Sequence, residues 1–68
     1  MEKIDKRFGQ VAVEIGIITR EQLIEAMQAQ ILEELKGARY RLVGEILRDE
    51  GYITDAQIDE VIESMSSF

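Results

Sequence analysis

An arginine and a glycine close to the start of the chain are the first residues whose types and spacing suggest chemistry. Arg7 lies two residues before Gly9, near the expected beginning of a helix. A guanidinium beside a helix N-terminus suits a phosphate, because the cation and the free amides attract the same anion. The alternative is a solvated Arg7 that pairs with Asp5 or Glu14. Gln30, on the apolar side of a later helix, could hydrogen-bond a ligand base or lie at the rim of the core.

Catalytic and metal-binding side chains are scarce. The chain contains no His and no Cys, and no Ser stands beside a suitable base. Glu33 and Glu34 are adjacent, and adjacent residues on a helix do not face each other. The usual zinc ligands are missing, and the carboxylates lack the spacing of a calcium loop. We therefore expect no enzyme, no metal site and no resident cofactor.

Charge and hydropathy narrow the choice of partners. The net charge of −6, from 14 acidic and 8 basic residues, opposes the approach of a nucleic acid backbone. None of the helices that the sequence predicts carries the basic face of a DNA-binding helix. There is no signal-peptide core and no apolar run of membrane-spanning length. We expect a cytoplasmic protein that neither binds DNA nor inserts into a membrane.

The chain contains two copies of one pattern, 35 residues apart, and such a repeat predicts two equivalent structural units. Apolar positions recur at the same offset, as in Val11 and Ile46 or Ala26 and Val61. The identical residues are Gly9 and Gly44, Gly16 and Gly51, Ile18 and Ile53, Thr19 and Thr54, Gln22 and Gln57, and Glu25 and Glu60.

Apolar residues at helical spacing predict an all-α fold of four helices, over 5–15, 20–36, 42–50 and 55–64. They form one domain over 1–65, as two tandem helix–Gly–Thr-cap–helix repeats. Repeat one covers 5–36, repeat two covers 41–65, and 66–68 form a frayed tail. A chain of 68 residues buries a modest core. We therefore also expect self-association.

Helix boundaries rest on capping signals. Thr19 with Gln22, and Thr54 with Gln57, predict two capping boxes, each preceded by a glycine that ends the helix before it. Asp5 is the expected N-cap of the first helix. The segment 37–41 offers no Ser, Thr, Asp or Asn to cap the third helix.

Gly9 and Gly44 fall inside two of these helices, where each costs about 1 kcal/mol relative to Ala. Their equivalent positions indicate that something approaches the helix backbone closely. A packed partner helix is the favoured explanation, and a ligand is the alternative.

These positions carry a family resemblance. The chain resembles the cyclic-di-GMP-binding N-terminal domain of type II secretion and type IV pilus assembly ATPases. That domain has two copies of Arg-Leu-Gly, followed by a Gly, two Leu and a Gln at fixed spacing. Copy one here matches in spacing over 7–30, and copy two over 42–65. No Gly-x4-Gly-Lys phosphate loop is present, so we expect a free-standing copy of this domain.

The resemblance implies two half-sites for a dinucleotide. In each, an Arg meets a phosphate or a guanine edge, the Gly admits close approach and apolar residues pack on the purine. The first half-site would comprise Arg7, Phe8, Gly9, Leu23, Met27 and Gln30, and the second Leu42, Val43, Gly44, Ile58 and Ile62.

The second copy departs from the motif. Leu42 replaces the expected Arg, Arg41 lies one residue early and Met65 replaces the Gln. An unpartnered polar edge of a buried ligand is penalised. We therefore predict a small protein-interaction or regulatory module, which binds a protein partner or a second copy of itself. A cyclic-di-GMP sensor is the alternative.

Overall fold

The computed structural model describes residues 3–37 and 39–66. Within them the chain forms α1 (Lys3–Glu14), α2 (Arg20–Leu35), α3 (Val43–Asp49) and α4 (Asp55–Ser66), and no strand. The prediction of an all-helical chain is therefore confirmed, and each boundary lies within two residues of the expected one. Among the described residues no helix combines the length and apolar content needed to cross a bilayer.

The two helix–glycine–helix corners share an equivalent hydrogen bond and an equivalent glycine. In the first corner, the Ile17 amide donates to the Ala12 carbonyl at 3.0 Å, and Gly16 adopts a φ of 79°. The counterpart in the second corner is a bond from the Tyr52 amide to the Leu47 carbonyl at 2.9 Å, with Gly51 at 82°. A left-handed backbone of this kind favours glycine.

Both predicted Thr capping boxes are present. The Gln22 amide donates to Thr19 Oγ1 at 3.1 Å, and the Thr19 amide donates to Gln22 Oε1 at 2.9 Å. Thr54 and Gln57 make the equivalent pair of bonds, at 3.1 and 3.0 Å. Each box satisfies backbone amides that a helix start leaves without intrahelical partners.

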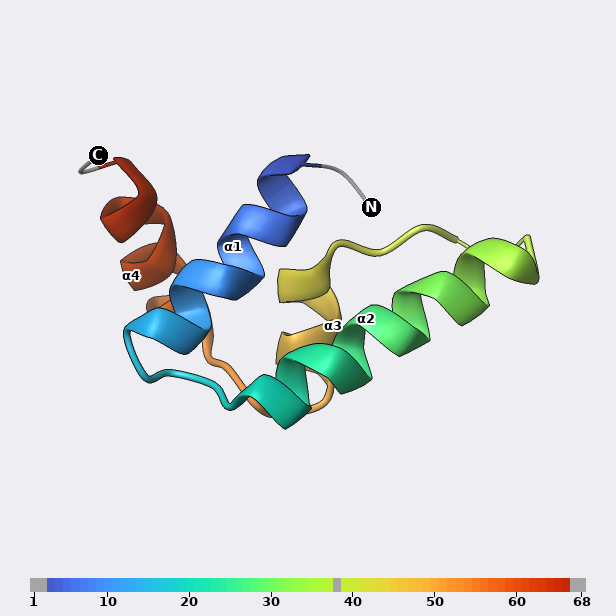
Figure 1. The fold of residues 1–68 in the computed structure, drawn as a ribbon, viewed down its shortest axis with the longest axis horizontal. Coiled ribbons are helices and arrows are strands. Elements are labelled where there is room, and N and C mark those ends of the chain that lie inside the picture. The colour runs from blue at the N-terminus through green and yellow to red at the C-terminus, as the bar shows by residue number, and fades with distance from the viewer. Residues whose placement is uncertain (1–2, 38, 67–68) are drawn as a thin grey trace.

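The two halves of the chain interlock within one molecule. α1 packs against each of the other three helices, and α3 packs against α2. Figure 1 shows α1 between α4 on one side and the α2–α3 pair on the other. The C-terminal half of α2 extends away from α1 and α4, which contributes to an elongated shape of 35 × 22 × 19 Å.

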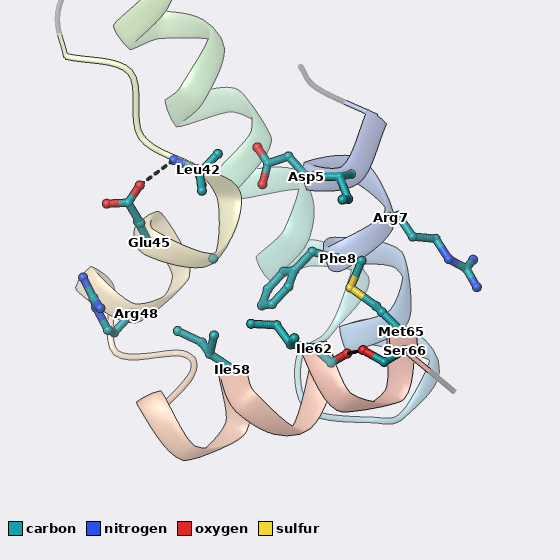
Figure 2. A pocket seen from close by; sticks show the side chains of 12 residues that line it. Asp5, Arg7, Phe8, Leu42, Glu45, Arg48, Ile58, Ile62, Met65 and Ser66 are labelled. Atoms are coloured by element: carbon teal, nitrogen blue, oxygen red, sulfur yellow. Dashed lines mark hydrogen bonds between the residues drawn. The ribbon is translucent and has the colours of Figure 1, made fainter. Parts of the chain in front are cut away.

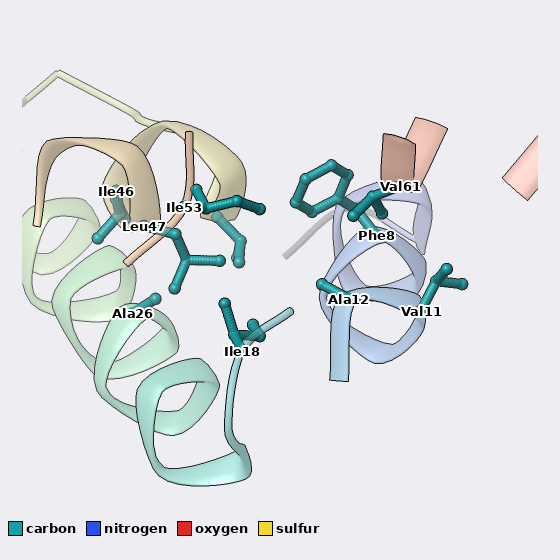
Figure 3. Packing of buried hydrophobic residues seen from close by; sticks show 10 residues of the cluster. Phe8, Val11, Ala12, Ile18, Ala26, Ile46, Leu47, Ile53 and Val61 are labelled. Atoms are coloured by element: carbon teal, nitrogen blue, oxygen red, sulfur yellow. The ribbon is translucent and has the colours of Figure 1, made fainter. Parts of the chain in front are cut away.

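The apolar core follows the repeat. Its side chains come from all four helices and both corners (Figure 3). The buried apolar residues form five pairs at the 35-residue offset: Phe8 and Val43, Val11 and Ile46, Ala12 and Leu47, Ile18 and Ile53, and Ala26 and Val61.

Two terminal details differ from expectation. Asp5 is not the N-cap of α1, because α1 already begins at Lys3. α4 continues to Ser66, which we expected in the tail, and Ser66 Oγ donates to the Ile62 carbonyl at 3.0 Å. Residues 67 and 68 of the expected tail lie outside the described residues.

The start of α3 is capped by two carboxylates, one from α3 itself and one from α1. The Leu42 amide donates to Glu45 Oε1 at 3.0 Å, one helical turn ahead. The Val43 amide, the first of α3, donates to Asp5 Oδ1 at 2.8 Å. Asp5 therefore caps α3 across 38 residues of sequence, and the carboxylate also suits the positive end of the helix dipole.

Candidate functional site

An open groove of about 670 Å³ lies between α1, α3 and α4 (Figure 2). Both repeats contribute to it, since α1 comes from the first and α3 and α4 come from the second. The lining residues are Ile4, Asp5, Arg7, Phe8, Leu42, Gly44, Glu45, Arg48, Ile58, Ile62, Met65 and Ser66.

The lining of the groove is mainly apolar. Phe8 from α1 and Ile58 and Ile62 from α4 converge on it in Figure 2. Ile4 and Ile62 remain 71% and 50% exposed. A concentration of exposed aliphatic side chains in one concave place is typical of a binding surface.

Charged residues stand around this apolar surface. The Arg7 guanidinium points away from the other labelled side chains in Figure 2. Arg48 forms an ion pair with Asp55 at 3.4 Å. Glu45 accepts from Arg39 at 3.3 Å in addition to capping α3. The groove thus has an apolar interior and a rim that carries both positive and negative side chains.

The space beside Gly9 is filled by α2. A Cβ atom added to Gly9 would lie 2.5 Å from Leu23 Cδ1. Met27 is partly buried against the core. At Gly9 the structure therefore contains close helix packing, which was the favoured explanation for the two glycines.

Gln30 is part of a buried polar cluster and does not line the groove, although its partner Asp5 does. Its side chain is 2% exposed. Nε2 donates to Asp5 Oδ2 at 2.7 Å, to the Arg41 carbonyl at 2.9 Å and to the Tyr40 hydroxyl at 3.3 Å. The cluster joins α1, α2 and the segment before α3, so the Gln30 side-chain nitrogen already has its partners within the chain.

The Arg41 side chain bridges α2 and α3. Its guanidinium pairs with Glu33 through two hydrogen bonds and with Asp49 at 2.7 Å. The hydrogen bond from Arg41 holds the pKa of Glu33 below its usual value, although partial burial opposes the shift. The Glu33 and Asp49 carboxylates in turn raise the pKa of Arg41.

Most of the predicted second half-site lines the groove. Leu42, Gly44, Ile58 and Ile62 are there, whereas Val43 is fully buried in the core. A Cβ added to Gly44 would lie 3.1 Å from a Phe8 ring carbon. The residues that the structure brings together are therefore Arg7, Phe8, Leu42, Gly44, Ile58 and Ile62, and those it places elsewhere are Gly9, Leu23, Met27, Gln30, Arg41 and Val43.

Several lining residues were not among the predicted ones. Ile4 could have been found, because it continues the helical spacing of Phe8 and Val11 toward the N-terminus. Met65 occupies the Gln position of the motif, and its apolar side chain lines the groove. Glu45 and Arg48 resemble any other charged residues on a helix surface, so the sequence gives no signal for them.

Among the described residues, no group of three or more carboxylates is placed to hold a metal ion. Comparisons of the chain with family models, with curated proteins and with solved structures give no match. Any proposal for the function of the chain therefore rests on the geometry of the groove.

Proposed function

We propose that the chain is a non-enzymatic, cytoplasmic protein-interaction module, and that its groove binds an apolar-faced helix of a protein partner. The observation that carries the proposal is the groove itself. It is lined by side chains from three helices, its interior is apolar, and its rim is charged. Helix-in-groove binding uses this arrangement, because apolar anchors bury area while the rim sets orientation.

The charge of the chain indicates the kind of helix that would bind. The net charge of −6 attracts basic partners over long range and speeds their encounter. We therefore propose a partner helix with one apolar face and basic residues beside it.

The test is affinity capture with matched variants. The wild-type chain, Ile62→Asp and Ile15→Glu are immobilised after circular dichroism has shown equal helicity. Ile15 is also an exposed aliphatic residue, 41% exposed, but it does not line the groove. A groove partner should be recovered with the wild type and with Ile15→Glu, and lost with Ile62→Asp. Equal recovery on all three would contradict the proposal.

A cyclic-di-GMP sensor is the second candidate. It is supported by the presence of Phe8, Gly44 and apolar residues of the second copy in one groove, with Arg7 at its edge. It ranks second because Gln30 and Arg41, two of the expected polar ligands, have partners within the chain. Calorimetric titration with cyclic-di-GMP separates the candidates. Saturable binding that Arg7→Ala weakens and Arg20→Ala leaves unchanged would favour the sensor.

A further inference from the structure

The two glycines inside α1 and α3 are covered by different elements, although the repeat makes them equivalent. The three atoms nearest to a Cβ added at Gly9 all belong to Leu23 of α2. The three nearest to a Cβ added at Gly44 all belong to the ring of Phe8, at 3.1, 3.2 and 3.7 Å. The residue equivalent to Leu23 in the second repeat is Ile58 of α4. By the symmetry of the repeat, Ile58 should be the nearest residue to Gly44, and the Phe8 ring takes that place instead.

The size of one side chain accounts for this difference. Phe8 and Val43 occupy equivalent positions, and both are buried. α1 packs against α4 as α3 packs against α2, so each of the two side chains belongs to a helix that meets the other repeat. The Phe8 ring reaches Gly44, whereas no Val43 atom is among the three nearest to a Cβ at Gly9. Val is the shorter side chain, and Leu23 covers Gly9 in its place.

The groove lies where the second repeat lacks the contact that the first repeat makes. α1 and α2 of the first repeat pack closely through Gly9 and Leu23. α3 and α4 of the second repeat instead line the groove, with Gly44 and Ile58 both at its surface. Figure 2 shows the Phe8 ring reaching from α1 toward Ile58. Because protein interiors are filled to high density, a ring in this place keeps another side chain out of it.

We propose that Phe8 is the positioning residue that holds the groove open. Its ring occupies the surface of α3 at Gly44, so Ile58 does not close on α3 as Leu23 closes on α1. The absence of a side chain at Gly44 belongs to the same arrangement, because it gives the ring room against the helix backbone. The inference deepens the proposed function and rests on it in one respect: the space that Phe8 keeps open is where the partner helix places an apolar side chain.

NMR of the free chain tests this role without any partner. Phe8→Val makes position 8 identical to its counterpart at position 43. Ile58 should then move over Gly44, so cross-peaks between the Ile58 methyl groups and the Gly44 Hα protons should gain intensity. Cross-peaks between Leu23 methyl groups and the Gly9 Hα protons are the internal control and should keep theirs. A folded Phe8→Val chain with unchanged Ile58–Gly44 cross-peaks would overturn the proposal.

Phe8→Leu keeps this test decisive where Phe8→Val does not fold, since the loss of a buried ring leaves a cavity. Leu retains more of the buried volume than Val does. The Ile58–Gly44 cross-peaks should therefore gain intensity in the same direction and to a smaller extent. No gain in the folded Phe8→Leu chain would equally overturn the role of Phe8.

A dye titration measures the open groove in solution. Anilinonaphthalene sulfonate fluoresces on exposed apolar surface, and Ile62→Asp gives the signal that arises outside the groove. Phe8→Val should lose most of the fluorescence difference between the wild type and Ile62→Asp. Ile58→Ala should restore this difference in the Phe8→Val background, because it removes the side chain that closes the groove. A further loss of fluorescence in the double variant would show that Phe8 acts only as a contact.

Affinity capture then separates this inference from the proposed function. If the wild type recovers no protein that Ile62→Asp loses, the proposed function fails, and the NMR and dye results decide the role of Phe8 by themselves. If the wild type recovers such a partner, Phe8→Val should lose it and Ile15→Glu should keep it. Equal recovery by the wild type and a folded Phe8→Val chain would leave the proposed function standing and overturn the role of Phe8.

Discussion

The two repeats share their corners and differ in how their glycines are covered. In the first repeat, Leu23 from α2 lies over Gly9. In the second repeat, the equivalent residue of α4 is Ile58, but the ring of Phe8 from α1 lies over Gly44 instead. Ile58 remains at the surface of the groove. The second repeat therefore has a concave surface beside Gly44, whereas Leu23 fills the equivalent place beside Gly9 in the first repeat.

The two repeats also differ in the polar residues at equivalent positions. Gln30 of the first repeat is buried and hydrogen-bonded to Asp5, whereas its counterpart Met65 lines the groove. The counterpart of Asp5 is Tyr40, which is 39% exposed. Hydrogen bonds of the polar cluster therefore connect α2 to the start of α3, whereas the apolar groove separates α4 from the start of α1. The candidate site therefore lies where the symmetry of the repeat is broken.

Removal of the Asp5 carboxylate is expected to have the largest effect. Asp5→Ala should lower the free energy of unfolding by about 3 kcal/mol, because the Val43 amide loses its buried acceptor and Gln30 loses its shortest hydrogen bond. Tyr40→Phe, at the counterpart position, should cost less than about 1 kcal/mol, since it removes the longest of the Gln30 contacts. Urea denaturation followed by circular dichroism measures both.

Asp5→Asn keeps this prediction testable if Asp5→Ala does not fold. Asn retains one acceptor oxygen, so an intermediate loss of stability is expected. Equal stability of Asp5→Ala and Tyr40→Phe would mean that the cluster does not distinguish the two repeats.

A double-mutant cycle on Gly9 and Leu23 tests whether the first repeat is filled by close packing. Gly9→Ala alone should lower the free energy of unfolding by about 1 kcal/mol, because the new Cβ forces Leu23 to move. In a Leu23→Ala background, Gly9→Ala should raise the free energy of unfolding by up to about 1 kcal/mol. Ala has a higher helix propensity than Gly, and the clash with Leu23 is gone. A Gly9→Ala effect of the same sign and size in both backgrounds would exclude the contact as the reason for the glycine.

Acid titration addresses the ion pair of Arg41 and is expected to have the smallest effect. The folded chain holds the pKa of Glu33 below its usual value of 4.5. The stability that Glu33 contributes is therefore present above that value, and it is lost as pH falls through the lowered pKa. The difference in unfolding free energy between the wild type and Glu33→Gln should shrink as pH drops below 4.5. A difference that is independent of pH would show that Arg41 does not act through the Glu33 charge.

Much of the local structure was predictable, because its signals lie within a few residues of one another. Thr19 and Gln22 are three residues apart, and their capping box forms as predicted. The polar half of the implied ligand site was not predictable in the same way. Gln30 and Arg41 have the residue types of ligands, yet their partners Asp5 and Asp49 come from other helices. A side chain's partner across helices depends on how the helices pack, which spacing within one helix does not specify.

Four helices, the two Thr capping boxes and the glycine that ends each first helix follow from the amino-acid sequence alone, since hydrogen bonds and apolar periodicity within short segments suffice for these. Contacts between helices distant in the sequence are needed before Asp5 can be seen to cap α3, Phe8 to cover Gly44 and the groove to open beside α4. The physical reason is that the two copies share one apolar pattern, and this pattern does not specify which helix packs against which. A single difference in side-chain shape, such as Phe8 opposite Val43, then determines which place is filled and which stays open.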